Sequence, residues 1–256
     1  MVNLHIIGVQ KGGTTALSSF LDEHPDIFLL KNKEAHVFDD PAFLRATHKM
    51  QFAKNKYKTL STDYQGQKYT LDATPITLFN PVFLAHCYRY NPNAKFIVVL
   101  RDPVERAISH YQMSFVRKQE AKNMLLSFLF EQLRLQKHTS DWRFTSPLRT
   151  QSYLSRGLYS TQLNSLFQTI PANQVLVLYN QDLRERHEET MKKIFSFLEL
   201  TKHKTKAREI FKGESLPNTF INRLAKQYAK AYFKIKKENR RSWDTIIQNA
   251  QTLGDA

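Results

Sequence analysis

The chain has 256 residues, 41% of them hydrophobic and 12% aromatic, which excludes a chain that is disordered throughout. Cys87 is its single cysteine, which excludes an intrachain disulfide and a cysteine-based metal cluster and favours a reducing compartment. The formal net charge of +15 favours anionic partners. Met1 leads almost directly into an apolar run of strand length, and no apolar run approaches membrane-spanning length, so we expect a cytoplasmic protein without signal peptide or transmembrane segment.

Periodicity predicts alternating strands and helices along the chain. Apolar runs rich in β-branched and aliphatic residues predict strands at 4–9, 69–72, 95–100 and 174–179. Helical patterns are predicted at 14–22, 103–117, 123–136, 158–169, 187–199 and 220–238. This alternation predicts an α/β fold in which helices flank both faces of a parallel sheet. We expect a single domain, with a core at about 1–200 and a basic helical portion at 201–256.

The first predicted strand runs into a loop that contains three of the chain's seven glycines, Gly8, Gly12 and Gly13. A strand, a tight glycine turn and a helix start form a P-loop-like cradle whose backbone amides attract a phosphate-like anion. We expect Lys11 and the hydroxyls of Thr14 and Thr15 to complete this cradle. Because Lys11 precedes the glycine pair, the spacing differs from that of nucleoside-triphosphate loops. An ordinary glycine-rich turn with a solvated lysine is the alternative.

A second set of polar residues follows the strand at 95–100. Arg101 comes directly after that strand, and Asp102 with Pro103 predicts an N-cap and the first turn of a helix. Ser109 lies two turns into this helix. Arg101 and Ser109 could therefore face one anion, or Arg101 could form a structural ion pair while Ser109 is merely exposed.

The last part of the chain is strongly basic. Residues 201–241 contain 13 Lys and Arg against three acidic residues, which attracts polyanions such as acidic glycans or is simply a solvated face. The aromatic and aliphatic residues there follow helical spacing and predict a buried stripe, formed by Ile221, Leu224, Tyr228, Tyr232 and Ile235. That spacing is unlike a base-stacking platform, so nucleic acid stays a minor alternative. The basic side chains that could guide an anionic acceptor are Arg223, Lys226, Lys230 and Lys234.

Together, the two anion-binding segments resemble those of sulfotransferases that use 3′-phosphoadenosine 5′-phosphosulfate (PAPS), especially the heparan-sulfate branch and its bacterial relatives. The matching segments are Gly8-Val-Gln-Lys-Gly-Gly-Thr-Thr15 and Val99-Leu-Arg-Asp-Pro-Val-Glu-Arg-Ala-Ile-Ser109. Further similarity, in the same order over about 4–200, covers His24-Pro25, Lys33-Glu-Ala-His-Val-Phe-Asp39, Asp72-Ala-Thr-Pro75, Gly157-Leu-Tyr159 and Val175-Leu-Val-Leu…Asp182-Leu…Phe197-Leu198.

The resemblance implies roles for individual residues. The donor PAPS, with PAP as product, would be bound through its 5′-phosphosulfate by the cradle, with Lys11 at the bridging oxygen, and through its 3′-phosphate by Arg101 and Ser109. Tyr159 is expected near the adenine, and Lys212 and Gly213 over the 3′-phosphate. No metal is required in this scheme, and the sequence offers no convincing carboxylate pair for one.

Glu34 matches the position of the catalytic glutamate in the glycan sulfotransferases and is the predicted general base. The alternative is an ion pair with Lys31 or Lys33. His36 could orient Glu34, contact the acceptor or act as the base. One departure from the family is Ala73, where the glycan branch often has lysine. Asp72 beside it could then face the acceptor or be a buried structural carboxylate.

The predicted function is therefore sulfuryl transfer from PAPS to a hydroxyl or amine of a carbohydrate-type acceptor. Three alternatives remain at this stage: sulfation of a small molecule or lipid, an ATP-dependent kinase with an aberrant loop, and a polyanion-binding module without catalysis. The sequence does not identify the acceptor.

Overall fold

The computed structural model describes residues 1–205, 207–208 and 217–254. The chain divides into two compact units. The first comprises 1–101, 164–211 and 249–256, and the second 102–163 and 212–248. Whether the chain folds as one domain, as the sequence suggests, stays a prediction.

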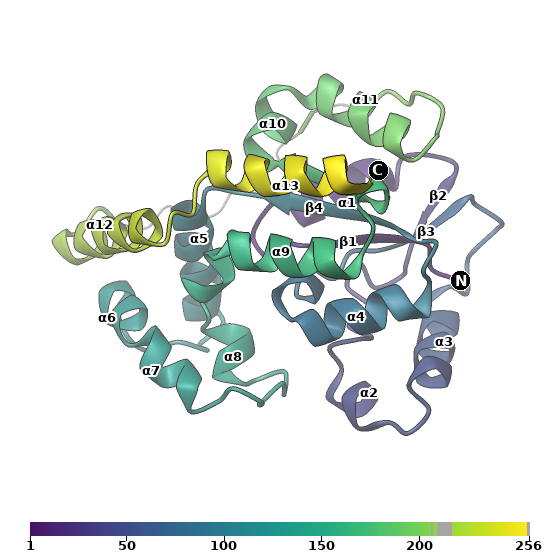
Figure 1. The fold of residues 1–256 in the computed structure, drawn as a ribbon. Helices are drawn as coiled ribbons and strands as arrows, with labels where there is room; N and C mark the ends of the chain where they lie inside the picture. The colour runs from purple at the N-terminus through teal and green to yellow at the C-terminus, as the bar shows by residue number, and fades with distance from the viewer. Residues whose placement is uncertain (206, 209–216, 255–256) are drawn as a thin grey trace. The chain divides into compact units, whose positions relative to one another are not determined.

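The first unit is built on a parallel sheet, as predicted, with five strands where the sequence indicated four (Figure 1). Its strands, in the order β2-β3-β1-β4-β5, are β1 (Leu4–Gly8), β2 (Ile27–Leu29), β3 (Tyr69–Asp72), β4 (Lys95–Leu100) and β5 (Val175–Tyr179). Every neighbouring pair is parallel. Its helices are α1 (Thr14–Leu21), α2 (Pro41–Arg45), α3 (Lys49–Leu60), η1 (Thr77–Phe79), α4 (Pro81–Tyr90), η3 (Ala172–Gln174), α10 (Asn180–Glu185) and α11 (His187–Phe197).

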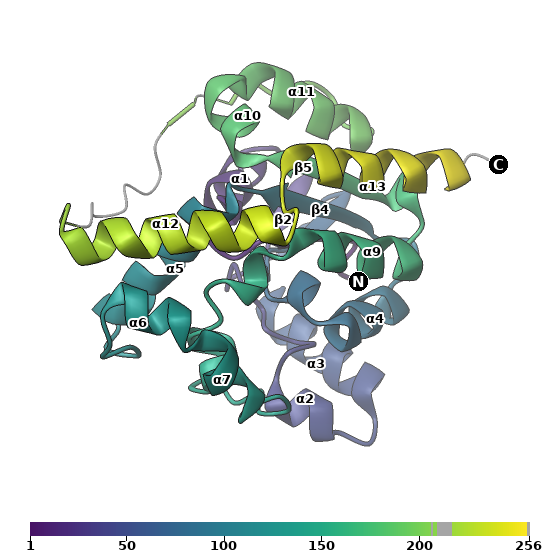
Figure 2. The ribbon, with the colours of Figure 1, turned by 60° about the vertical axis from the view of Figure 1, so that its left-hand side comes forward.

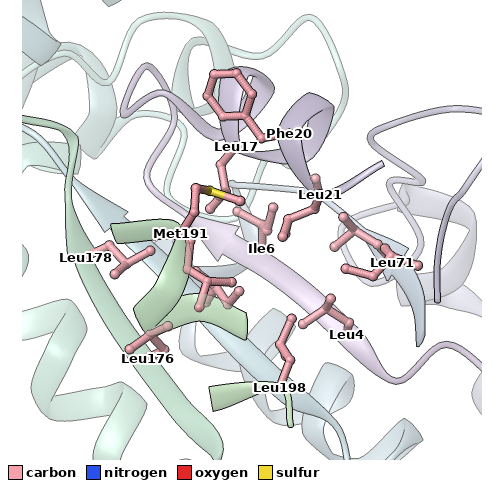
Figure 3. Close-up of a cluster of buried hydrophobic side chains, with 14 of the residues drawn as sticks. Leu4, Ile6, Leu17, Phe20, Leu21, Leu71, Leu176, Leu178, Met191 and Leu198 are labelled. Carbon is pink, nitrogen blue, oxygen red and sulfur yellow. The ribbon is translucent and has the colours of Figure 1, made fainter. Parts of the chain in front are cut away.

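The sheet is covered on both faces. On one face, α1 and α11 pack apolar side chains onto the strands (Figure 3). The buried residues labelled there are Leu4, Ile6, Leu17, Phe20, Leu21, Leu71, Leu176, Leu178, Met191 and Leu198. On the other face, His5 of β1 stacks on Phe96 of β4, and Tyr88 of α4 packs against the same Phe96 ring. Burial on both faces explains why the central strands are almost uniformly apolar.

The second unit is helical. It contains α5 (Pro103–Val116), α6 (Met124–Leu129), α7 (Glu131–Gln136), α8 (Pro147–Thr150), η2 (Ser155–Gly157) and α12 (Phe220–Ile235). Two helices, α9 (Tyr159–Thr169) and α13 (Arg240–Gly254), cross the division between the units. Its core joins α5, α6 and α12, which lies beside α6 (Figure 2).

Two helix predictions in this unit need correction. The single helix predicted at 123–136 is divided into α6 and α7 at Phe130. The predicted buried stripe of α12 was also wrong at its ends, because Ile221 is 43% and Ile235 is 78% exposed. Small and aromatic residues one position along the helix are buried instead, namely Ala225, Ala229 and Phe233. Side-chain spacing alone did not distinguish the two overlapping stripes.

Candidate active site

The candidate site lies at the C-terminal ends of the parallel strands. The glycine loop follows β1, Arg101 follows β4, Asn180 follows β5, and β3 ends at Asp72. Parallel strands end at a common edge of their sheet, which is where ligands bind in open α/β folds. The sheet therefore gathers residues that are far apart in the sequence.

Both glycines at the end of the loop are required by its geometry. A Cβ at Gly12 would lie 2.5 Å from the carbonyl oxygen of Val99. Gly13 has φ of +100° and is the N-cap of α1, so the first turn has no capping side chain. Unpaired amides at such a helix start attract anions. A phosphate group therefore fits the donors that this loop and helix present.

Two side chains from neighbouring strand ends hold the loop. The amide of Asn180 donates to the Gly12 carbonyl at 2.9 Å, and the guanidinium of Arg101 donates to the Lys11 carbonyl at 3.3 Å. Lys11 itself has a left-handed backbone, with φ of +68°. Arg101 lies at a strand end, as predicted, but its contact with the loop was not predicted. Asn180 was missed altogether.

Lys33 connects the loop to the predicted base. Its ammonium donates to Thr15 Oγ1 at 2.9 Å and to Glu34 Oε1 at 2.7 Å. The ion pair that was considered as the alternative role for Glu34 is thus present. This ion pair is compatible with catalysis. The Lys33 ammonium contacts both the candidate phosphate cradle and the candidate base, so it is a cation between the two.

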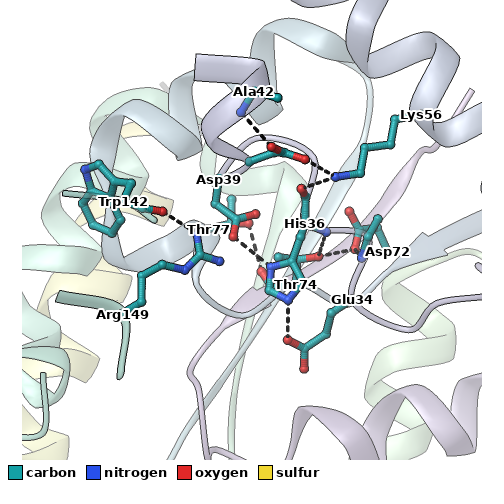
Figure 4. A network of polar contacts seen from close by, with 12 residues as sticks. Glu34, His36, Asp39, Ala42, Lys56, Asp72, Thr74, Thr77, Trp142 and Arg149 are labelled. Carbon is teal, nitrogen blue, oxygen red and sulfur yellow. Dashed lines mark hydrogen bonds and ion pairs between the residues drawn. The ribbon is translucent and has the colours of Figure 1, made fainter. Parts of the chain in front are cut away.

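A carboxylate lies at each nitrogen of the His36 ring (Figure 4). Nε2 is 3.3 Å from Glu34 Oε2, and Nδ1 is 2.8 Å from Asp39 Oδ2. A ring flanked on both sides by acceptors is best satisfied when both nitrogens carry a proton. Although burial lowers its pKa, the hydrogen bonds to Asp39 and Glu34 dominate and raise the pKa of His36 to about 9.

These contacts favour different roles for Glu34 and His36. Burial raises the pKa of Glu34, but the hydrogen bond from His36 and the charge of Lys33 outweigh it and lower the pKa overall. Glu34 is therefore ionised near neutral pH, as a base must be. His36, in contrast, is protonated there and is suited to orienting Glu34. Its catalytic role, like that of Glu34, stays a prediction.

The segment that carries Glu34 and His36 is fastened to the end of β3. Three hydrogen bonds join them: Ala73 N to the Lys33 carbonyl at 2.9 Å, Ala35 N to Asp72 Oδ1 at 3.3 Å, and His36 N to Thr74 Oγ1 at 3.3 Å. His36 has φ of +48°, a conformation that non-glycine residues keep only where surrounding contacts enforce it. The three hydrogen bonds hold the backbone of His36 in this conformation.

Asp72 is the centre of this attachment. It is 2% exposed, and its carboxylate accepts hydrogen bonds from Tyr57 OH at 2.7 Å and Thr74 Oγ1 at 2.6 Å. Burial raises its pKa despite these donors. Asp72 is thus the buried structural carboxylate of the two possibilities considered from the sequence.

Comparison with known proteins gives the family. The protein-family model described as "Sulfotransferase domain" matches residues 3–252 of this chain. The chain belongs to the sulfotransferase domain family. The sulfotransferase "Heparan sulfate glucosamine 3-O-sulfotransferase 3B1" of Mus musculus is 30% identical over 195 residues, which is 76% of this chain and 45% of that one. "Membrane-associated sulfotransferase kil1" of Dictyostelium discoideum is 34% identical over 131 residues, 51% of this chain and 27% of that one. This sulfotransferase domain thus spans less than half the length of either relative.

Solved structures agree with the fold. A sulfotransferase from Alicyclobacillus acidocaldarius superposes with a TM-score of 0.71 at 22% identity, covering 95% of this chain and 99% of that chain. The sulfotransferase domain of the curacin biosynthetic pathway gives a TM-score of 0.50 at 13% identity, covering 79% and 75%. The parallel sheet flanked by helices is therefore the sulfotransferase fold.

No contact described in the structure supports the cofactor roles predicted for the remaining residues of the sulfotransferase domain. Ser109 is partly buried on α5 of the second unit, so its joint action with Arg101 stays a prediction. Tyr159 is fully buried, and its ring packs on Trp243 at 5.0 Å. Lys212 and Gly213 lie outside the described residues.

Among the residues that the structure describes, no group of three or more His, Cys, Asp or Glu side chains could hold a metal ion. None of the helices in that part of the chain is both long and apolar enough to cross a membrane.

Proposed function

We propose that this domain transfers a sulfuryl group from PAPS to a hydroxyl or amine of a carbohydrate acceptor, with Glu34 as the general base. The observation that carries the proposal is a continuous chain of contacts from Thr15 through Lys33 to Glu34, and from Glu34 through His36 to Asp39. It joins the candidate phosphate cradle to an oriented carboxylate. The family match and the names of the curated relatives support the reaction and the acceptor class.

The loop and α1 supply the donor site in this proposal. When bound, PAPS supplies a sulfuryl group on a phosphosulfate anhydride. The Gly13 amide, with Thr14 and Thr15, binds the 5′-phosphate, and Lys11 stabilises negative charge on it. The Gly12 amide, predicted to share this role, instead donates to the Val9 carbonyl at 2.8 Å and closes the loop. Lys33 provides a second cation on the side of Glu34. Binding of the 3′-phosphate by Arg101 belongs to this proposal too.

Glu34 takes the proton from the acceptor group as that group attacks. A carboxylate whose pKa is lowered is a weak base, but it is ionised at working pH. In phosphoryl transfer, loose transition states place more weight on positioning and charge than on early proton removal, and we extend that reasoning to sulfuryl transfer. His36, held by Asp39, keeps the Glu34 carboxylate aimed at the acceptor.

Glu34→Gln tests this assignment, with PAPS as donor, heparan-type oligosaccharides as acceptors and the sulfated product measured by mass spectrometry. The turnover number should fall about 10²–10⁴-fold, while PAP affinity stays within about twofold. Glu188→Gln is the matched control, because Glu188 is exposed on α11. Unchanged turnover in Glu34→Gln would remove Glu34 as the base. Magnesium-dependent ATP consumption, or glycan binding without any transfer, would favour the kinase or the binding-module alternative.

The cytoplasmic location expected from the sequence stays a prediction.

A further inference from the structure

We propose that the second unit docks on a bilayer surface that contains anionic lipids, through the exposed side of α6 and α7. This surface, termed the α6–α7 face, is an apolar stripe of four residues. Leu126, Leu129, Phe130 and Leu133 are exposed by 39%, 44%, 47% and 59% (Figure 2 shows the two helices). The proposal concerns where the protein binds and does not depend on the reaction proposed above.

The four side chains share one face because the helical path continues through Phe130. Phe130 N donates to the Leu126 carbonyl and Arg134 N to the Phe130 carbonyl, both at 3.0 Å. Residues three, four and seven apart therefore lie one above the other. The opposite side of α6 is already used, since Met124 and Phe128 are buried in the core of the unit. A helix that is apolar on both sides has a second surface to cover.

Lysines stand at both ends of this stripe. Both are exposed: Lys122 directly precedes Asn123, the N-cap of α6, and Lys137 is the C-cap of α7. The acidic residues between 115 and 140 are Glu120 and Glu131, which are only 6% and 3% exposed. The surface of this segment is therefore apolar and positive, with no exposed carboxylate to offset it.

The end of α5, in the same unit, also carries exposed apolar and basic residues. Phe115 and Val116 are 51% and 69% exposed, and Arg117 and Lys118 follow them on the surface. Tyr111 OH of α5 donates to the Lys122 carbonyl at 3.0 Å, which ties α5 to the start of α6.

The second unit as a whole has the same character. Of the 14 exposed large apolar side chains among the described residues, 10 lie in this unit. Its described residues include 17 Lys and Arg against seven Asp and Glu.

An anionic bilayer uses both features of the face. Apolar side chains enter the headgroup boundary while lysines attract the lipid charge. A second copy of the chain would bring Lys122 and Lys137 against lysines of the other copy, which is unfavourable. An acidic polysaccharide would satisfy the lysines and leave the leucines without a partner. The combination therefore favours a lipid surface.

Vesicle co-sedimentation tests the proposal. The full chain should bind vesicles of phosphatidylcholine and phosphatidylserine in equal amounts, and should not bind phosphatidylcholine alone. Leu129→Ser with Leu133→Ser should weaken binding at least tenfold, whereas Val82→Ser, exposed on α4, should leave it unchanged. Lys122→Ala with Lys137→Ala should weaken it by about fivefold per lysine, and more at low salt than at high salt. Lys54→Ala with Lys58→Ala on α3 is the charge-matched control.

Three results would overturn the proposal. These are no binding to anionic vesicles, equal binding by the wild type and the double leucine variant, and a dimer in sedimentation velocity that this variant abolishes. Circular dichroism and PAP affinity of each variant show that it is folded. Transfer to a soluble acceptor is measured separately, so absent transfer with intact vesicle binding contradicts only the proposed function, and the reverse contradicts only the lipid surface.

Discussion

Tyr57→Phe is the most informative single change, because it removes one hydroxyl and leaves the ring. That hydroxyl donates to buried Asp72 at 2.7 Å, and Asp72 in turn accepts from the backbone of Ala35, next to Glu34. Loss of a buried hydrogen bond to a charged group costs about 1.5–3 kcal/mol. For a chain of this size, the melting temperature should fall by about 3–10 °C.

The same change should slow turnover without affecting donor binding. Asp72 and Thr74 hold the backbone of Ala35 and His36, whereas the glycine loop is held by Asn180 and Arg101. A shift of the base by a fraction of an ångström is enough to reduce the turnover number by about 10-fold or more. PAP affinity should stay at the wild-type value.

The assay combines thermal and urea unfolding, PAP calorimetry and the turnover number. Tyr64→Phe is the matched control, since that hydroxyl is exposed and donates only to the Gln67 carbonyl at 2.9 Å. If Tyr57→Phe were as stable and as active as Tyr64→Phe, Asp72 would not position the catalytic segment. A loss of stability with wild-type turnover would leave Asp72 a purely structural role.

Three further predictions concern the same region. With the pKa of His36 raised to about 9, the stability that its ion pairs contribute is fully present below about pH 6.5 and is lost as pH rises through 9. Because the side chain is 32% exposed, we expect a loss of about 1–2 kcal/mol in urea unfolding between those limits, and a smaller loss in His36→Gln. Lys33→Met removes a charge that lowers the pKa of Glu34, so the acid limb of the turnover–pH profile should move to higher pH. If the limb did not move, Lys33 would not influence the ionisation of the catalytic base. Gly12→Ala places a Cβ against the Val99 carbonyl, so PAP binding should be lost and the free energy of unfolding reduced by about 1–3 kcal/mol. PAP binding by this variant with the wild-type affinity, measured by calorimetry, would contradict the close packing of the loop.

Local chemistry in the sequence was sufficient for the elements around the site. The β1–loop–α1 unit is confirmed, because apolar strand residues, glycines and a helix start lie next to one another in the chain. Asp102 caps α5 through a 2.9 Å bond from Glu105 N, with Pro103 in the first turn, as predicted. In these places each structural requirement is met by residues only a few positions apart.

Elements without such signals were missed. β2 has only three residues, Ile27–Leu29, too few to show a period. α3 and α4 were not predicted, although Asn80 caps α4 by accepting from Val82 N at 2.8 Å. α3 buries only Ala53 and Tyr57 among its twelve residues, so its apolar period is weak.

The supporting contacts of the site were not accessible from the sequence either. Tyr57 and Asp72 are hydrogen-bonded although they are 15 positions apart in the sequence, and Asn180 and Gly12 are 168 positions apart. Neither spacing follows from periodicity, because strand order and loop paths decide it. Asp39 could have been predicted as a partner of His36. It lies three residues after His36, in the segment Lys33–Asp39 that carried the resemblance.

The central claim is that the glycine loop and Arg101 bind a 3′-phosphorylated sulfuryl donor. Calorimetric titration with PAP and with AMP, without metal, tests it most directly. We expect PAP to bind about 100-fold more tightly than AMP, and Arg101→Ala to remove most of that difference. Equal affinities for the two nucleotides in the wild type, or a preference for magnesium-bound ATP, would contradict the account.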